Sequence, residues 1–222
     1  TSVHILLILY SAEFMSDAEW AFISGGLFYI IFGIWFAAVF LLNFFRKRKY
    51  RNEEWFPVVD PDGKVTGAAP RSICHNGKSK LLHPVVHLHL LNSKGEIFLQ
   101  KRSPAKDIQP DKWDTSTGGH VATGETVEDA LKREVLEEIG LRNFNARFLG
   151  KYVWESEIEK ELVFSFVCIS DDIPHINSPE ITDGRFWSET EIEKNLGKGV
   201  FTPNFEHEYR FLKEKTRILA EK

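Results

Sequence analysis

The sequence predicts an α/β domain that is preceded by a single transmembrane helix. Residues 21–45 carry no charged side chain, which is typical of a membrane-spanning segment. After residue 57, short segments with strand-like composition are interleaved with segments of helical periodicity. Strands and helices that alternate along a chain are typical of an α/β fold. The 222 residues provide room for one domain of ordinary size and an appendage.

The apolar stretch at residues 21–45 predicts the membrane span. At about 1.5 Å per residue it would reach roughly 37 Å as a helix, and the hydrocarbon core of a bilayer is about 30 Å thick. A helix of this length that is apolar on all sides rarely fits the core of a small soluble domain. Acidic residues precede the stretch and no small-residue cleavage site follows it, so a cleaved signal peptide is the weaker interpretation. Residues 1–20, which begin with threonine, receive no assignment.

A basic segment follows the apolar stretch directly. Residues 46–56 are expected to form a juxtamembrane linker. All of residues 46–51 except Tyr50 are lysine or arginine. The positive-inside rule therefore predicts an external N-terminus and a cytoplasmic domain, with residues 21–51 in contact with membrane lipid. The formal net charge of the whole chain is -4, so we do not expect a nucleic-acid polymer as partner. The oligomeric state stays open.

Residues 57–222 are expected to form the α/β domain. The DPDG turn at residues 60–63 predicts a short hairpin. Two cysteines, Cys74 and Cys168, have no metal-site spacing and are expected to be reduced thiols. The remaining elements expected in chain order are strands at residues 81–91, 97–100, 113–117, 148–155, 162–169 and 185–187, a short helix capped by Ser188 and Glu191, and an amphipathic helix at residues 205–219.

The segment from Gly119 to Leu141 is the most informative part of the domain. Thr126 and Asp129 form a capping-box start and Gly140 is a helix stop, which together predict a helix at residues 127–139. On that helix an apolar stripe lies beside a flank that carries Glu134, Glu137 and Glu138. Like charges at this spacing repel each other unless a cation neutralises them, and oxygen ligands of this kind suit Mg²⁺ or Mn²⁺. The competing interpretation is a solvated acidic face with an Arg133–Glu137 pair.

The spacing of the whole segment resembles the Nudix box at every defined position, from Gly119 and Glu125 through Arg133 to Leu141. This resemblance implies an α/β/α sandwich with a mixed sheet and metal-dependent hydrolysis of a diphosphate linked to another moiety. By the same resemblance, Arg133 orients the glutamates, and Glu134 and Glu137 are catalytic. The implied metal ligands are Glu134, Glu137, Glu138, the carbonyl of Gly119, and Glu125.

The general base and the substrate contacts are not settled by the box. Glu137 is one candidate base, and Glu159 and Glu161 near the start of a later strand are others. Lys101 and Arg102 are expected to meet substrate phosphate, with Glu161 as a further substrate contact. The expected partner is a small-molecule diphosphate of nucleoside or isoprenoid type, and the loops at residues 103–112 and 171–183 carry no motif that identifies it.

A second resemblance comes from the histidines. Their placement is similar to that in Nudix-fold isopentenyl-diphosphate isomerases, which implies a second metal held by His75, His83 and His120 with Glu159 and Glu161. A structural role for each histidine competes with this expectation, and His87 and His89 are expected to be packing or surface residues. The reactive cysteine of those isomerases falls at Gly118 here, and glycine cannot transfer a proton. Hydrolysis is therefore favoured over isomerisation, and the complete box disfavours a third interpretation, a non-catalytic nucleotide-binding module.

Overall fold

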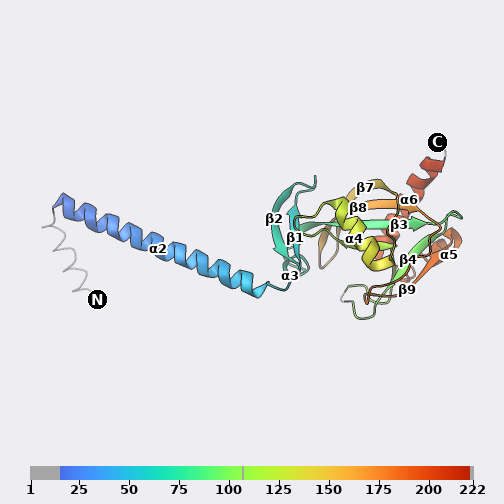
Figure 1. The fold of residues 1–222 in the computed structure, drawn as a ribbon, viewed down its shortest axis with the longest axis horizontal. Helices are drawn as coiled ribbons and strands as arrows, with labels where there is room; N and C mark the ends of the chain where they lie inside the picture. Colours follow the sequence, from blue (N-terminus) through green and yellow to red (C-terminus); the bar gives the residue numbers. More distant parts are fainter. Residues whose placement is uncertain (1–15, 107, 221–222) are drawn as a thin grey trace. The chain divides into compact units, whose positions relative to one another are not determined.

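The computed structural model of the chain describes residues 16–106 and 108–220 (Figure 1). The chain divides into two compact units, Thr1–Asn52 and Glu53–Lys222. Each unit is described by itself. The expected features of the segment before residue 16 lie outside the described residues.

The described part of the first unit, residues 16–52, contains one long helix, α2 (Asp17–Lys49). Ser16 and Glu19 cap its start reciprocally, because the Ser16 N–H donates to Glu19 Oε2 at 2.9 Å and Ser16 Oγ accepts from the Glu19 N–H at 3.4 Å. The apolar part of the helix, Asp17–Phe45, has a mean hydropathy of 2.3, and its most apolar stretch is not buried. This helix is long and apolar enough to cross a membrane. The helix continues through part of the basic segment that was expected to be linker, because lysine and arginine favour helix and no breaker intervenes.

The second unit begins with a small sheet. Strands β1 (Trp55–Val59) and β2 (Val65–Pro70) form the antiparallel hairpin expected around the DPDG turn. A one-turn helix, α3 (Arg71–Cys74), follows directly and was not predicted. Phe56, Ala69 and Cys74 form the buried centre of this small layer, which positions His75 immediately after α3.

The main sheet has seven strands and is mixed. Its central strand β3 (Leu82–Leu91) runs parallel to β8 (Lys160–Ile169), which pairs with β7 (Ala146–Glu155) in an antiparallel hairpin. On its other edge, β3 pairs with two antiparallel partners, β4 and β6. The remaining bounds are β4 (Ile97–Arg102), β5 (Trp113–Asp114), β6 (Thr117–His120) and β9 (Ile181–Trp187), with β5 and β9 paired to β4.

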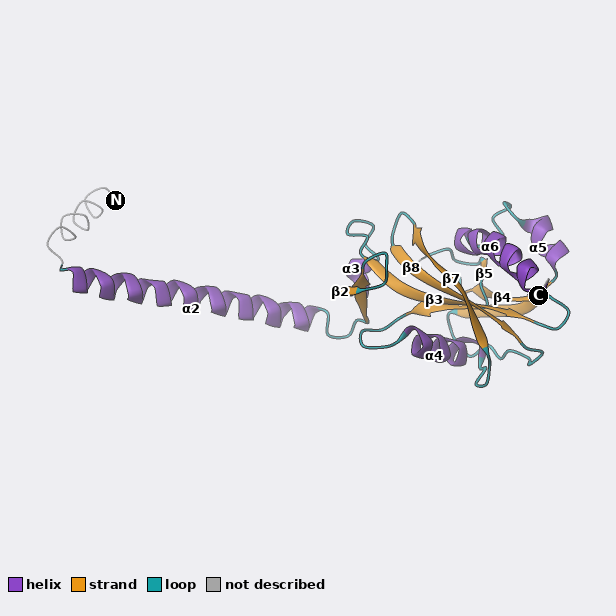
Figure 2. Cartoon of the chain, turned by 90° about the horizontal axis from the view of Figure 1, so that it is seen from above, coloured by secondary structure: helices purple, strands orange, loops and turns teal. Residues whose placement is uncertain are grey.

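Helices cover both faces of this sheet and produce the sandwich (Figure 2). Helix α4 (Val127–Ile139) packs its apolar stripe on one face against alternate residues of β3 and β8, such as Leu88 and Phe166. Helices α5 (Glu189–Asn195) and α6 (Pro203–Ala220) cover the other face, where Phe205 packs against Val167 of β8. The expected α/β/α sandwich and the bounds of the helix at 127–139 are confirmed. Both cysteines are free and buried.

The strand expected at residues 113–117 is divided into β5 and β6. Thr115 and Ser116 lie between them, and their hydroxyl groups form hydrogen bonds with main-chain groups of neighbouring strands. Thr115 Oγ1 donates to the carbonyl of Leu88 at 2.9 Å, and Ser116 Oγ accepts from the N–H of Leu90 at 2.7 Å. These side chains replace main-chain hydrogen bonds between strands, so the segment pairs with β4 through β5 and then with β3 through β6. Gly118, Gly119 and His120 therefore lie beside β3.

Candidate active site and metal centre

The glutamate flank of α4 meets strand β6 at Gly119. The carboxylate of Glu134 lies so close to this residue that a Cβ atom on Gly119 would stand 2.0 Å from Glu134 Cδ. Helix α4 is held in this position by its start and its end. Thr126 Oγ1 accepts from the Asp129 N–H at 3.1 Å, and Gly140 ends the helix with a φ of 70°. Glycine at position 119 therefore gives the Glu134 carboxylate its place beside the main chain.

Arg133 connects the box residues through several hydrogen bonds. Its Nε and Nη2 each lie 2.8 Å from a carboxylate oxygen of Glu125, which makes a bidentate pair. Its Nη1 donates to Glu134 Oε1 at 2.7 Å, and its Nη2 donates to the carbonyl of His120 at 2.9 Å. The guanidinium thus fixes the orientation of Glu134 and ties α4 to the end of β6.

The other two glutamates of the flank have contrasting environments. Glu138 is buried, and its Oε2 accepts from the Gly118 N–H at 3.1 Å and from Gln100 Nε2 at 3.3 Å. Burial, and then the charge of Glu134, raises the pKa of Glu138 to about 8. Glu137 is 59% exposed, with only a 3.4 Å contact from its Oε2 to Arg133 Nη1 among the described residues. The structure therefore brings Glu134 and Glu138 together at Gly118 and Gly119 and leaves Glu137 accessible to water.

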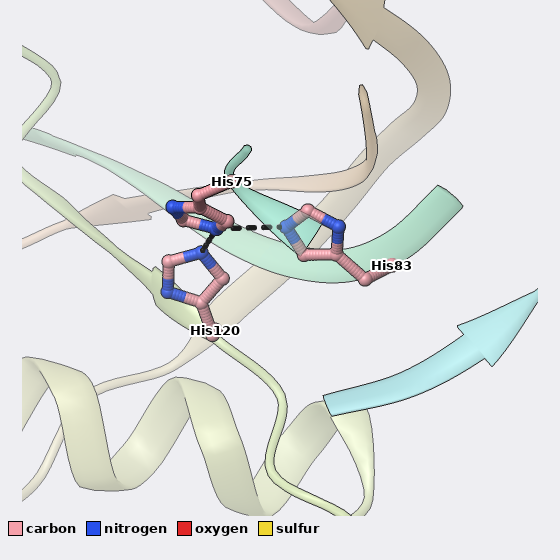
Figure 3. Close-up of side chains that lie close together, drawn as sticks. All are labelled: His75, His83 and His120. Carbon is pink, nitrogen blue, oxygen red and sulfur yellow. Dashed lines mark hydrogen bonds between the residues drawn. The ribbon is translucent and has the colours of Figure 1, made fainter. Parts of the chain in front are cut away.

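The three histidines expected to hold a second metal converge in space (Figure 3). His75 follows α3, His83 lies in β3, and His120 ends β6. The Nε2 atom of His75 is 3.3 Å from Nε2 of His83 and 3.1 Å from Nε2 of His120. Phe56 supports the group, because its ring stacks on the imidazole of His120 at a centroid distance of 4.3 Å and an angle of 5°.

The contacts of His83 leave a nitrogen lone pair directed at His75. His83 Nδ1 lies 2.9 Å from the carbonyl of Leu81, so this nitrogen carries the proton and Nε2 presents a lone pair to His75. Burial and the charge of Arg71 lower the pKa of His75 to about 3, and burial lowers the pKa of His83 and His120 as well. Three neutral imidazoles with facing nitrogen atoms are the arrangement that a bound cation stabilises.

Two buried carboxylates complete this group. Glu159 Oε2 lies 3.3 Å from His75 Nδ1, and Glu161 Oε1 lies 4.0 Å from His120 Nε2. Burial raises the pKa of both carboxyl groups, to about 8 for Glu161, where the neighbouring Glu159 adds to the effect. Both residues are only 8% exposed, so neither carboxylate belongs to a solvated surface turn. Imidazole nitrogens with carboxylate oxygens form a donor set that suits divalent transition metals.

The two cations expected to bind substrate phosphate have other contacts. Arg102 Nη1 donates to Asp114 Oδ2 at 3.1 Å, while its Nε and Nη2 donate to the carbonyl of Ile108. Lys101 Nζ lies 3.8 Å from Asp111. Neither residue forms a hydrogen bond or ion pair with a box residue within the described part of the chain. Arg102 thus contacts the loop that follows it through Ile108. Its charge partly offsets the effect of burial, which raises the pKa of Glu159.

Two residues that were not predicted from the sequence support the histidine group and the box carboxylates. Arg71 Nη1 lies 3.4 Å from His120 Nδ1, and Gln100 donates to Glu138. Arg71 precedes His75 by one helical turn, but no pattern in the sequence marks this short helix. Gln100 is the last residue of a predicted strand, and its inward direction follows from the strand alternation that places Phe98 in the core.

The chain is similar to known proteins over more than half of its length. The family model described as the NUDIX domain matches residues 81–205. An uncharacterised Nudix hydrolase of Listeria monocytogenes is 32% identical over 161 residues, which cover 69% of this chain and 90% of the relative. An isopentenyl-diphosphate Delta-isomerase of Pectobacterium atrosepticum is 29% identical over 144 residues, 63% of this chain and 79% of the relative. A crystal structure of a Deinococcus radiodurans protein has a TM-score of 0.61 and 24% identity, and the match covers 71% of this chain and 98% of that protein.

Proposed function

This chain belongs to the Nudix hydrolase family, and from that premise we propose that it hydrolyses a diphosphate linked to another moiety, most specifically a nucleoside diphosphate derivative. The observation that carries the proposal is the convergence of Glu134 and Glu138 on the main chain of Gly118 and Gly119. A glutamate cluster that closes against a glycine strand in this way has the form of a cation site. We propose Mg²⁺ or Mn²⁺ as the cation.

The donor set fits such an ion. Glu134, Glu138 and the exposed carboxylate of Glu137 would supply oxygen atoms, and we propose the carbonyl of Gly119 as a further ligand. The raised pKa of Glu138 marks a buried carboxylate whose charge is not fully compensated by the protein. When bound, the ion neutralises phosphate charge and makes water more acidic.

The side chains of the protein have separate tasks in the proposed reaction. Arg133 holds Glu134 in one orientation and is itself anchored by Glu125, so we assign both residues a positioning role. Glu137 is accessible to water and is the proposed acceptor of the proton that the attacking water loses. A phosphorus–oxygen bond of the anhydride breaks, and the oxygen of water is retained in one product.

We propose a second cation site at His75, His83 and His120, with Glu159 and Glu161 as the oxygen ligands. The facing Nε2 atoms support it. The same group is the one observation that favours the alternative function, an isomerase of the isopentenyl-diphosphate type. Position 118 is glycine, however, and has no thiol for proton transfer. The complete set of box carboxylates also disfavours a non-catalytic binding module.

The location proposed for this activity is the cytoplasmic face of a membrane. Support comes from the length and hydropathy of α2 and from the basic residues at its C-terminal end. A single-pass anchor with its acidic end outside would keep the catalytic unit in the cytoplasm and bring residues 46–51 to anionic lipid. Such an anchor is compatible with a soluble or a lipid-linked diphosphate.

The proposal is tested by turnover of a diphosphate panel. The full chain in detergent and residues 53–222 alone are incubated with Mg²⁺ or Mn²⁺ and with nucleoside diphosphate derivatives, isoprenoid diphosphates and nucleoside triphosphates, and the products are identified by mass spectrometry. We expect hydrolysis of at least one compound and a loss of more than about 100-fold in kcat/KM for Glu134→Gln. Glu128→Gln, an exposed glutamate in the first turn of α4, is the matched control and should retain activity. Equal turnover by both variants in EDTA would contradict the assignment.

A further inference from the structure

A buried pair of charged residues lies on the α6 side of the sheet, outside the box. His87 of β3 and Glu208 of α6 are joined by a 2.7 Å contact between Nδ1 and Oε2. Glu208 is completely buried, and its Oε2 is also 3.5 Å from Nε2 of His89. His87 was expected to be a packing or surface residue, and the contact with Glu208 gives it a more specific environment.

This pair is not explained by stability alone. Removing two charges from water is costly, and a buried ion pair is often no more stable than an apolar pair of the same volume. Polar atoms beside the pair also lack partners. Glu208 Oε1 and Ser165 Oγ are buried and form no hydrogen bond within the described residues, and Ser165 is the register partner of His87 on β8. Buried polar atoms normally have partners, so this region has hydrogen-bonding capacity that the described chain does not use.

The pair adjoins the candidate active site through one residue. Gly118 is the register partner of His87 on β6, and a Cβ atom on Gly118 would lie 3.3 Å from His87 Nε2. The N–H of Gly118 donates to Glu138 Oε2. The two-residue segment Gly118–Gly119 therefore contacts the box carboxylates and the imidazole of His87. An organic group that extended from Gly118 toward the α6 side of the sheet would meet this imidazole.

The imidazole presents a donor in that direction. Because Nδ1 is engaged by Glu208, the remaining nitrogen Nε2 faces Gly118, and it has no hydrogen-bond partner among the described residues. Burial lowers the pKa of His87, but the charge and the hydrogen bond of Glu208 outweigh this and raise the pKa to about 9. The charges of Glu161 and Asp114 act in the same direction. His87 is thus a cation with a free N–H at neutral pH.

The side chains near the pair are polar as well. Tyr152 of β7 donates from its hydroxyl to Asn204 Oδ1 at 2.7 Å, and Asn204 lies one helical turn before Glu208 on the same face of α6. Ser165 adds a hydroxyl from β8. A hydrocarbon chain against the Ser165 hydroxyl and the Nε2 atom of His87 would leave both without partners, which is unfavourable.

We propose that His87 is a specificity-determining residue whose Nε2–H donates to an oxygen atom of the organic group on the diphosphate, so that the site selects a nucleoside over an isoprenoid group. The proposal rests on the proposed hydrolytic function. Glu208 acts through His87 and is a positioning residue. A site built to hydrogen-bond a polar group rejects analogues that lack that group, because its own polar atoms are then left unpaired.

Paired kinetics with the full chain in detergent test this assignment. A nucleoside diphosphate derivative that the enzyme turns over and dimethylallyl diphosphate are compared under the same Mg²⁺ concentration. We expect the wild type to prefer the nucleoside compound. His87→Leu should lower kcat/KM for that compound by about 10- to 100-fold, mainly by raising KM, and change turnover of the isoprenoid compound less than about 3-fold. His87→Gln, which keeps an amide donor, should restore part of the loss, and His175→Gln is the exposed control.

The outcomes separate this inference from the function on which it rests. If the wild type hydrolyses no diphosphate, the proposed function fails. Turnover by the wild type with an unchanged preference in His87→Leu overturns the role of His87 alone, as does an equal loss with both compounds. Should His87→Leu not fold, the wild type still decides the question by nitrogen NMR with Ca²⁺ in place of Mg²⁺. The Nε2 resonance of His87 should shift when the nucleoside compound binds, and an unchanged resonance at saturation overturns the inference.

Discussion

At the scale of single residues, the candidate site depends on short distances that only certain side chains allow. Gly119 is the clearest example, since the carboxylate of Glu134 occupies the space that any other side chain at position 119 would take. The sequence predicted this neighbourhood because the box residues lie close together along the chain. It did not predict the pair of His87 and Glu208, because 121 positions separate the two residues and neither belongs to a local motif.

Gly119→Ala should remove most of the activity and leave the fold intact. The backbone at position 119 suits alanine, but the new Cβ would displace Glu134, whose flexible side chain can move away. We expect kcat/KM to fall by more than about 100-fold with a melting temperature near that of the wild type. Gly67→Ala is the matched control, because a Cβ there meets nothing within 4 Å. Full activity in Gly119→Ala would show that the position of Glu134 is unimportant.

The charge of His87 predicts a specific pH dependence of stability. Its pKa is raised from 6.5 to about 9 in the folded chain, so its stabilising effect is fully present below pH 6.5 and is lost as the pH rises through 9. The difference in unfolding free energy between residues 53–222 and their His87→Gln variant should therefore shrink between pH 7 and pH 10, by an amount on the order of 3 kcal/mol. Urea unfolding at both pH values measures it. A difference independent of pH would mean that His87 is neutral in the folded state.

At the scale of elements, three short segments bring the histidines together: the residue after α3, the start of β3 and the end of β6. The helix α4 could be predicted to the residue, because its cap, its apolar stripe and its glycine stop are all local signals. Helix α3 and the break between β5 and β6 could not. They depend on contacts with β1, β3 and β4, which tertiary packing creates and which propensity alone does not reveal.

Binding of a transition metal should stabilise the histidine group. Addition of Zn²⁺ to residues 53–222 in saturating Mg²⁺, which occupies the box site, should raise the melting temperature, because a ligand that binds only the folded state shifts the unfolding equilibrium. His120→Ala should abolish most of the shift, whereas His175→Ala, an exposed loop histidine, should retain it. The same increase in both variants would place the metal elsewhere.

At the scale of the whole molecule, the chain combines an apolar helix with a compact catalytic unit. The positions of most strands along the chain could be predicted from the residues, since turn residues such as those of the DPDG segment bound the strands. Pairing of β3 with β8 in parallel could not be predicted from the residues themselves, because parallel partners lie far apart in sequence. The sandwich was predicted from the resemblance to the Nudix box, because local sequence patterns do not determine which strands pair.

The apolar helix predicts how the protein partitions between membrane and solution. The full chain should remain with membranes after alkaline carbonate extraction, whereas residues 53–222 should be released, because the second unit contains no comparable apolar helix among its described residues. Fractionation with antibody detection measures both. Release of the full chain into the supernatant would contradict a membrane span.

In the proposed hydrolysis, water attacks a phosphorus atom of a bound diphosphate, and incorporation of oxygen-18 from water measures this step. A single turnover in H₂¹⁸O with Mg²⁺ should place one ¹⁸O atom in one of the two phosphate-containing products, as read by mass spectrometry or by the isotope shift in phosphorus NMR. Glu134→Gln should give no labelled product in the same time. Conversion of the substrate to an isomer without ¹⁸O, or stable binding without any product, would contradict the account.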